Sequence, residues 1–301
     1  MNKDITYGQV VEYDIFRRDQ SRVRDWEFRV MLESQCHRQN CVLTLTYDDS
    51  HLPEHGELSI RDYQLFLKML RKHVYPNKIR YFGCGEYGSK GKRPHYHIII
   101  FGYCPDDLRY FYSKRLRNGG ENKFYQSDII SRLWYRGFVN VCPNVCPEVI
   151  PYVCKYLQKF NADYLFWIDE DGVRRDMAKP FITMSRRPGI GLNALHSGLV
   201  DVKTDKLYFN GKSIRIPRYY LNKLQEEYQA KEFYFDNAFG ELECSSDLSP
   251  FELSFVQPDT IVDEIRKKRR DFWKSRFDSE KYVNNVVKFQ QFKNERVRTG
   301  R

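Results

Sequence analysis

The sequence lacks long apolar runs. Its longest uninterrupted hydrophobic stretches are a few residues long, far short of the roughly 20 that a membrane-spanning helix needs. The opening segment, MNKDITYGQVVEYDIF, has no apolar core of the kind that a signal peptide carries, so we predict none. A nucleotide-binding P-loop is also missing: Gly211-Lys212-Ser213 resembles its end, but Lys206 stands where the motif needs glycine. We therefore expect neither a membrane protein nor an ATP-driven motor.

Cysteine pairs with the spacing of a zinc site are missing too. The eight cysteines are scattered along 301 residues, which favours a reduced compartment. Two groups come nearest to a zinc pattern, Cys36-His37-x3-Cys41 and Cys142-x3-Cys146, but their spacings are not those of zinc-knuckle pairs. A zinc-binding structural protein is therefore the weakest of the alternatives.

Basic charge and aromatic residues are what the sequence has in excess. Lys and Arg outnumber Asp and Glu by 50 to 40, for a net charge of +10, and aromatics make up 16%. The charge is uneven: residues 225–254 carry a net −7, and residues 261–301 a net +7. This balance favours an anionic partner, of which nucleic acid is the commonest. The basic tail is consistent either with a solvated helix or with a phosphate-binding arm.

The pattern of apolar residues predicts an α+β fold with a central antiparallel sheet flanked by helices. Alternation with period two indicates strands, and apolar residues three and four apart indicate helices. Ser59 is well placed to cap a helix over residues 60–74, and Asn210-Gly211 predicts a hairpin turn. The order is strand 41–49, helix 59–74, strands 78–88 and 95–103, helix 124–135, strand 137–141 and helix 147–160.

Two histidines in RPHYHIIIFG, His95 and His97, predict a metal site. Residues two apart on a strand share a face, so both imidazoles project together and are able to bind one cation. Glu86 ends the preceding strand and would lie beside them in a hairpin. Two histidines and a carboxylate suit Mg²⁺ or Mn²⁺ on a substrate phosphate.

Two tyrosines in YVCKYLQK, Tyr152 and Tyr156, are four apart and therefore share a helix face. Such a pair usually belongs to a core, yet here it lies at the edge of the apolar stripe beside Lys155 and Lys159. A tyrosine hydroxyl has a pKa of about 10, so it needs a neighbouring cation or base to act as a nucleophile.

Together these segments resemble a known family. VLTLTY, RPHYHIIIFG and YVCKYLQK match, in order, the three motifs of HUH endonucleases, and the chain is most similar to gokushovirus-type replication initiators of microviruses. FITMSRRPGIG and IPRYYLNKL also resemble that group. The resemblance implies an RRM-like HUH domain over residues 1–200. Residues 201–301 would form a mixed, largely helical extension with a β-hairpin, an acidic segment and a basic tail.

The resemblance also implies an activity. Glu86, His95 and His97 would hold Mg²⁺ or Mn²⁺, Tyr152 and Tyr156 would be the nucleophiles, and Lys155 would assist them. Such an initiator nicks origin DNA, keeps the 5′ end as a phosphotyrosine and re-ligates the displaced strand. Its partners would be single-stranded or melted origin DNA and the host helicase and polymerase, without a membrane, in the bacterial cytoplasm.

Two rival functions stay open. An HUH transposase or relaxase-like nickase would share the metal site but often has one tyrosine. A non-catalytic nucleic-acid-binding module on an RRM-like sheet would explain the charge but not the histidines, carboxylate and tyrosines together. Tyr219 and Tyr220 fit core packing better than base stacking. Candidate phosphate contacts are Arg186, Arg187, Arg215, Arg218 and residues 266–270.

Overall fold

The computed structural model forms two compact units. One unit is residues 22–199, and the other joins residues 1–21 to residues 200–301. The proposed division into an endonuclease domain and a C-terminal extension stays a prediction, and the return of residues 1–21 to the C-terminal unit was not foreseen. The structure describes residues 6–88, 91–115, 119–143, 145, 150–154, 165–197, 199–200, 206–209, 212–227, 258–277 and 280–299.

A seven-stranded sheet forms the centre of the first unit. Its strands follow the order β4-β5-β6-β1-β3-β2-β9, and every neighbouring pair is antiparallel. The predicted α+β class with a central antiparallel sheet is thus confirmed. The strands are β1 (Asn40–Tyr47), β2 (Arg80–Tyr87), β3 (Pro94–Phe101), β4 (Arg109–Arg115), β5 (Glu121–Gln126), β6 (Gly137–Cys142) and β9 (Phe181–Met184).

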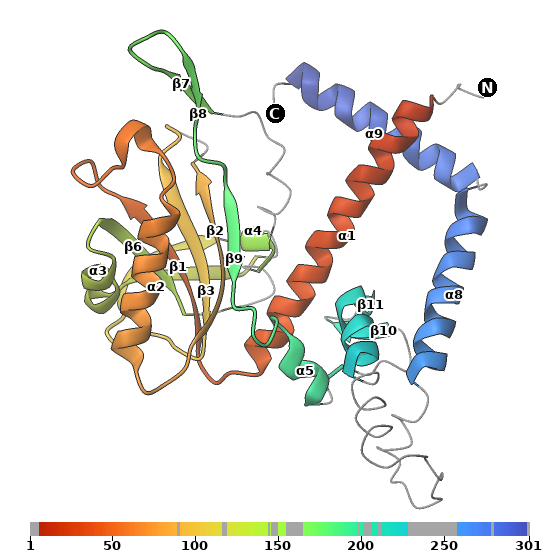
Figure 1. Ribbon diagram of the computed structural model, residues 1–301, viewed down its shortest axis with the longest axis horizontal. Coiled ribbons are helices and arrows are strands. Elements are labelled where there is room, and N and C mark those ends of the chain that lie inside the picture. The colour runs from red at the N-terminus through yellow and green to blue at the C-terminus, as the bar shows by residue number, and fades with distance from the viewer. Residues whose placement is uncertain are drawn as a thin grey trace, which may run out of the picture. The chain divides into compact units, whose positions relative to one another are not determined.

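Helices cover both faces of this sheet (Figure 1). On one face lie α2 (Ile60–Val74) and α3 (Asp128–Trp134). On the other face lie α4 (Ile150–Cys154) and the second half of α1 (Tyr7–Gln35), where Trp26 packs on Phe82 with ring centroids 5.4 Å apart. Smaller elements complete the unit: η1 (Glu54–Gly56), the hairpin of β7 (Phe166–Ile168) and β8 (Arg174–Asp176), and α5 (Leu192–His196).

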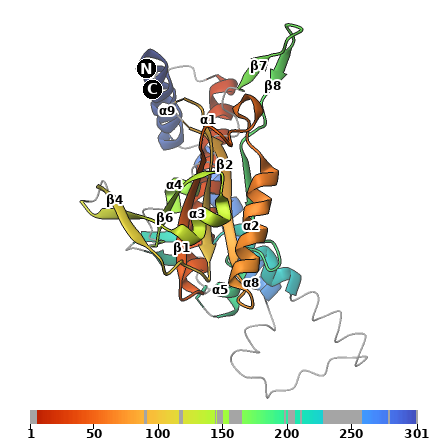
Figure 2. The ribbon, with the colours of Figure 1, turned by 90° about the vertical axis from the view of Figure 1, so that its left-hand side faces the viewer.

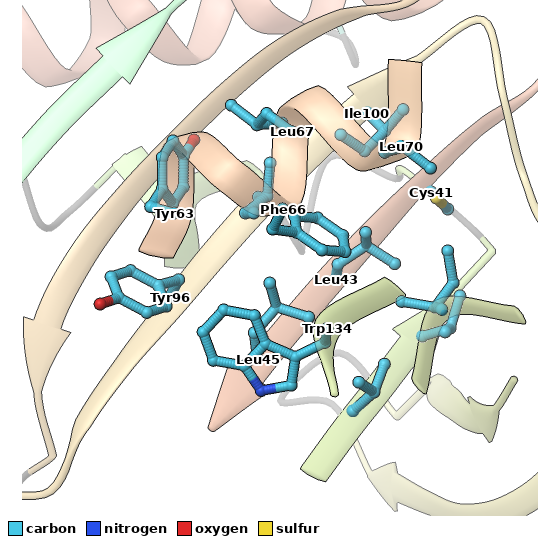
Figure 3. Close-up of a cluster of buried hydrophobic side chains, with 14 of the residues drawn as sticks. Cys41, Leu43, Leu45, Tyr63, Phe66, Leu67, Leu70, Tyr96, Ile100 and Trp134 are labelled. Carbon is cyan, nitrogen blue, oxygen red and sulfur yellow. The ribbon is translucent and has the colours of Figure 1, made fainter. Parts of the chain in front are cut away.

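The larger core lies between the sheet and α2 (Figure 3). Alternation along β1 and β3 sends every second side chain to this face, as the period of a strand requires. The predicted cap of α2 is confirmed, because Ser59 Oγ accepts a hydrogen bond from Asp62 N at 3.1 Å. Core side chains with at most 2% exposure include Leu43, Leu45, Tyr63, Phe66, Leu70, Tyr96, Ile98, Ile100 and Trp134.

A buried polar network ties α1 to the loop after β9. The carboxylate of Glu33 is fully buried and accepts hydrogen bonds from Gly191 N at 2.6 Å, Arg80 Nε at 2.5 Å and His37 Nε2 at 3.1 Å. Burial raises the pKa of Glu33, but these hydrogen bonds outweigh it and hold the pKa below its ordinary value. Arg29 Nε donates to Ile190 O at 3.0 Å, which adds a second anchor to the same loop.

Two sequence-based expectations need correction. The helix predicted over 124–135 begins at Asp128, because residues 121–126 pair with β4 as strand β5 and Ser127 Oγ accepts from Ile130 N as the cap. The helix α1 was missed altogether. Of the helix predicted over 147–160, residues 150–154 are helical and the others lie outside the described residues. The proposed linker, residues 243–254, also lies outside them.

The second unit is mostly helical within the described residues, as expected. The predicted hairpin is confirmed by the pairing of β10 (Lys206–Phe209) with β11 (Lys212–Arg215). The basic tail forms α8 (Pro258–Phe277) and α9 (Glu280–Thr299), and residues 218–227 are also helical. The first half of α1 belongs to this unit: Tyr282 Oη donates to Asp14 Oδ1 at 2.7 Å, and Lys293 Nζ donates to Glu12 Oε1 at 2.7 Å. Along the described residues, no helix has the length and apolarity of a membrane span.

Candidate active site

The register of two strands brings the predicted metal ligands together. Glu86 of β2 lies directly opposite His95 of β3, with His97 one residue pair away. Nε2 of His95 lies 3.1 Å from Glu86 Oε1, and Nε2 of His97 lies 3.2 Å from the same oxygen. The ligand atoms of the three residues all lie within 4.8 Å of one another. Two imidazoles and a carboxylate therefore converge on one point.

The outer nitrogen of each imidazole has its own partner. Nδ1 of His95 lies 3.1 Å from the carbonyl oxygen of Arg93, and Nδ1 of His97 lies 3.1 Å from Thr44 Oγ1. A carbonyl oxygen only accepts, so Nδ1 of His95 carries the proton and donates it. In the neutral ring the lone pair is then on Nε2, aimed at the carboxylate. A bound cation resolves that opposition of lone pairs, and a hydrogen-bonded Nδ1 is typical of metal-ligating histidines.

The site is buried on one side and accessible on the other. Glu86 and His97 are 5% and 3% exposed, whereas the His95 side chain is 17% exposed. A partly open position beside three ligands leaves room for a substrate oxygen. The donor set of two nitrogens and a carboxylate oxygen fits a divalent cation such as Mg²⁺ or Mn²⁺, and it does not by itself select one of them.

Tyr96, between the two histidines, anchors the strand from the opposite face. Its hydroxyl donates to Ser59 O at 2.8 Å and accepts from Ser59 N at 3.0 Å, and it lies 2.8 Å from the hydroxyl of Tyr47. Tyr47 Oη in turn donates to Asp62 Oδ2 at 2.9 Å. Burial raises the pKa of Tyr96 to about 12, so the hydroxyl stays protonated at neutral pH. Sequence reasoning missed this network, because a tyrosine at that position is typical of an apolar core residue.

Glycines in GCGEYG permit the close packing around the ligands. A Cβ on Gly83 would lie 2.6 Å from Tyr63 Oη and 2.8 Å from His97 O, and one on Gly85 would lie 2.8 Å from the Phe181 ring. Gly88 lies against the His95 ring, where a Cβ would meet Cε1 at 3.2 Å. Two of these glycines therefore make room for α2 and β9, and the third for the imidazole.

The helix that carries one of the predicted nucleophiles packs on the same sheet face as the metal ligands. Cys154 of α4 is fully buried, and burial together with the nearby Glu27 carboxylate and Cys84 thiol raises the pKa of its thiol. Cys84 lies on β2 two residues before Glu86 and so shares its face. Tyr152 is a residue of α4. Its side chain, and the whole of Lys155 and Tyr156, lie outside the described residues.

The other residues that the sequence singled out are placed as follows. Arg186, Arg187, Arg215 and Arg218 are exposed and remain candidates for phosphate contact, and Arg215 stacks on the Phe272 ring at 4.7 Å. Of the 266–270 run, Arg269 Nη2 donates to Ile216 O at 2.9 Å. Tyr220 is fully buried, which confirms core packing for that tyrosine.

The structure gives no support to a zinc site. His37 lies 3.1 Å from Glu33, and Cys41 is buried in the core cluster under α2. Among the described cysteines, histidines and acidic residues, the group formed by Glu86, His95 and His97 is the one with metal-binding geometry.

Comparison with known proteins fits this geometry. A family model of the replication-associated protein ORF2 matches residues 40–161, which include all three metal ligands and both tyrosines. This segment belongs to the replication-associated protein ORF2 family. Curated relatives align with the chain beyond the limits of that model. The resemblance to microvirus replication initiators is thus confirmed.

Three curated relatives carry names of the same kind. The chain is 31% identical to replication-associated protein ORF4 of Chlamydia phage 1 over 217 residues, which cover 69% of this chain and 51% of the relative. It is 38% identical to replication-associated protein VP4 of Bdellovibrio phage phiMH2K over 123 residues, 38% of each. It is 27% identical to replication-associated protein ORF2 of Spiroplasma virus 4 over 287 residues, 88% of this chain and 79% of the relative. The chain spans about half the length of the first of these relatives. No solved structure matches the chain.

Proposed function

We propose that this chain initiates rolling-circle replication by nicking one strand of origin DNA and later rejoining the displaced strand. The observation that carries the proposal is the convergence of His95 Nε2 and His97 Nε2 on one oxygen of Glu86, on the sheet face where α4 packs. The membership of residues 40–161 in a replication-associated family supports it independently. Host helicase and polymerase would be its partners, in the bacterial cytoplasm.

The metal would be held by Glu86, His95 and His97. Mg²⁺ or Mn²⁺ bound there supplies positive charge that offsets the charge developing on the scissile phosphate. The chain's own contribution is rigidity: both imidazoles are oriented through Nδ1, and β3 is fastened to α2 through Tyr96.

A tyrosine hydroxyl, of Tyr152 or Tyr156, would attack the phosphorus. The Oη–P bond forms and the P–O3′ bond breaks. The tyrosine gives up its proton, with Lys155 favouring the phenolate, and the leaving 3′ oxygen takes a proton from solvent. One phosphodiester replaces another, so the reverse step rejoins DNA without ATP. The second tyrosine would cut the regenerated origin, and the freed 3′-hydroxyl would release the first linkage.

A covalent adduct is the direct test. The full chain is incubated with Mn²⁺ and single-stranded oligonucleotides tiled across the replicon that encodes it. We expect a DNA-bound species that survives denaturation, and its peptide mass locates the modified residue. Tyr152→Phe combined with Tyr156→Phe should abolish the adduct, whereas Tyr75→Phe, an exposed tyrosine beyond α2, should leave it intact.

The outcomes separate the rival functions. An adduct that persists in the double variant overturns the tyrosine assignment. Loss of one tyrosine without any effect on strand rejoining favours a transposase or relaxase-like nickase. DNA binding without any adduct on any oligonucleotide favours the non-catalytic binding module. His97→Ala should abolish the adduct and spare DNA binding, because it leaves the basic surface unchanged.

A further inference from the structure

A pocket of about 420 Å³ opens between the β4–β5 hairpin and β6. Two phenylalanine rings line it, Phe111 from β4 and Phe138 from β6, which are 54% and 68% exposed. The side chains of Arg109, Gln126 and Asn140 line it as well. We propose that this pocket binds an unpaired base of a DNA strand that runs along the sheet to the metal ligands.

Strand pairing creates the pocket. β6 pairs with β1 over residues 137–142, but on its other side the described register with β5 consists of the pair Tyr125 and Val141. The two strands therefore diverge beside Phe138. The hairpin projects from that edge of the sheet (Figure 2).

A β-bulge directs the second ring. Tyr110 pairs with Tyr125 and Tyr112 pairs with Phe124, so Phe111 is the extra residue between them. Bulges re-aim a side chain and are common next to active sites. Tyr112 stacks on Phe124 with ring centroids 4.7 Å apart and planes 11° apart, which fixes the strand on one side of the bulge.

The start of β6 is fixed as firmly. Gly137 has φ +143°, and a Cβ there would lie 2.3 Å from Asp48 N and 2.5 Å from Thr46 O. Asp48 N also donates to Arg136 O at 2.9 Å. The backbone that carries Phe138 therefore lies close against β1, and the exposed ring stands on a rigid base.

The pocket and the metal ligands share a sheet face. Phe138 lies opposite Thr46, Thr46 lies opposite His95, and His95 lies opposite Glu86. Directly opposed residues of antiparallel strands point to the same side. Asn140, Thr44 and His97 form a parallel row. With strands about 4.8 Å apart, Phe138 lies about 10 Å from His95, so one short strand of DNA is able to reach both.

The chemistry of the pocket fits a nucleobase. Exposed aromatic rings stack on bases, and each stacked base contributes about 1–3 kcal/mol. The amides of Gln126 and Asn140 each offer a donor and an acceptor to a base edge. Arg109 is ion-paired with Asp128 at the rim. The exposed cations Lys114, Arg115 and Lys123 on the same hairpin favour a polyanion over an apolar protein segment.

This inference rests on the proposed function only for its choice of DNA, so its test avoids catalysis. Binding of the full chain to fluorescein-labelled dT30 is measured by anisotropy in EDTA, beside a 30-base-pair duplex. Phe138→Ala and Phe111→Ala should each raise the Kd for dT30 about 5- to 100-fold. The duplex Kd should not change, because paired bases are not free to stack between the rings. Tyr75→Ala, which removes an 82% exposed ring elsewhere, is the control.

A second measurement detects stacking itself. A 2-aminopurine placed within dT30 should be quenched on binding to the wild type and to His97→Ala, but not to Phe138→Ala. Quenching in His97→Ala without any adduct in the wild type would retain this inference and reject nicking. Unchanged dT30 affinity in both phenylalanine variants, with native circular dichroism, would overturn it. A dimer that either variant dissociates, at unchanged DNA affinity, would instead assign the pocket to a second copy.

Discussion

The hydroxyl oxygen of Thr44 lies 3.1 Å from Nδ1 of His97 across the β1–β3 pair. The contact fixes the imidazole from behind while Nε2 faces Glu86. It gives VLTLTY, an otherwise ordinary strand, a role in the site.

Loss of that hydroxyl should weaken metal binding. Thr44→Val keeps the shape of the side chain but removes the partner of His97, and loss of such an outer contact typically costs 10- to 100-fold in metal affinity. Thr44→Ser should restore most of the affinity because it restores the oxygen. Calorimetric titration of the metal-free protein with Mn²⁺ measures both. Equal affinities for wild type and Thr44→Val would show that the contact does not position the ring.

Tyr96→Phe should destabilise the first unit without removing a ligand. The change leaves the backbone N–H and carbonyl of Ser59 and the hydroxyl of Tyr47 without their partner, which costs about 1–3 kcal/mol. Urea unfolding gives the free energy of unfolding. Tyr110→Phe is the control, since its hydroxyl belongs to a 61% exposed residue. A Tyr96→Phe variant as stable as the control would contradict this account of the network.

Glu33→Gln should make stability depend less on pH. At neutral pH the change should cost about 3–5 kcal/mol, because Arg80 would lose its buried partner. The pKa of Glu33 is lowered on folding, so its contribution is complete above the ordinary value of 4.5 and is lost as pH falls through the lowered value. Urea unfolding of both proteins at pH 7, 5, 4 and 3 should show the difference shrink only in the acidic range. A constant difference would contradict the assignment.

Gly83→Ala should disturb both folding and the site. The added methyl would press on Tyr63 Oη and His97 O, and overpacking of this kind costs about 1–3 kcal/mol. Mn²⁺ affinity should fall with it, because the backbone of His97 would shift. Adding Tyr63→Phe removes one of the two clashing atoms and should restore part of the stability. Gly8→Ala, where the nearest atom is 4.0 Å away, should be close to neutral.

Much of the site was predictable from sequence because its residues are close in the chain and sit on a hairpin. Alternation placed His95 and His97 on one face, and the short loop placed Glu86 beside them. Their outer partners were not predictable, because Thr44 depends on the register between strands 53 residues apart in sequence. Arg93 contributes a backbone oxygen, which every residue has.

The fold was predictable where burial is one-sided. The helix α2 has a clear apolar stripe, whereas α1 is rich in charge along its whole length and buries residues mainly in its second half. The β4–β5 hairpin was missed because β4 is exposed along nearly all its length and has no apolar alternation. Tertiary pairing, rather than local pattern, made residues 124–126 a strand.

The pairing of β9 with β2 bears on how short the chain is able to be. A fragment cut to residues 40–161 would lose β9 and turn β2, the bearer of Glu86, into an unprotected edge strand. It would also lose Glu33 beneath Arg80 and Trp26 over Phe82. The stretch that marks the family is therefore smaller than the stretch that must fold together, and residues from about 22 to 199 form the natural minimum for expression.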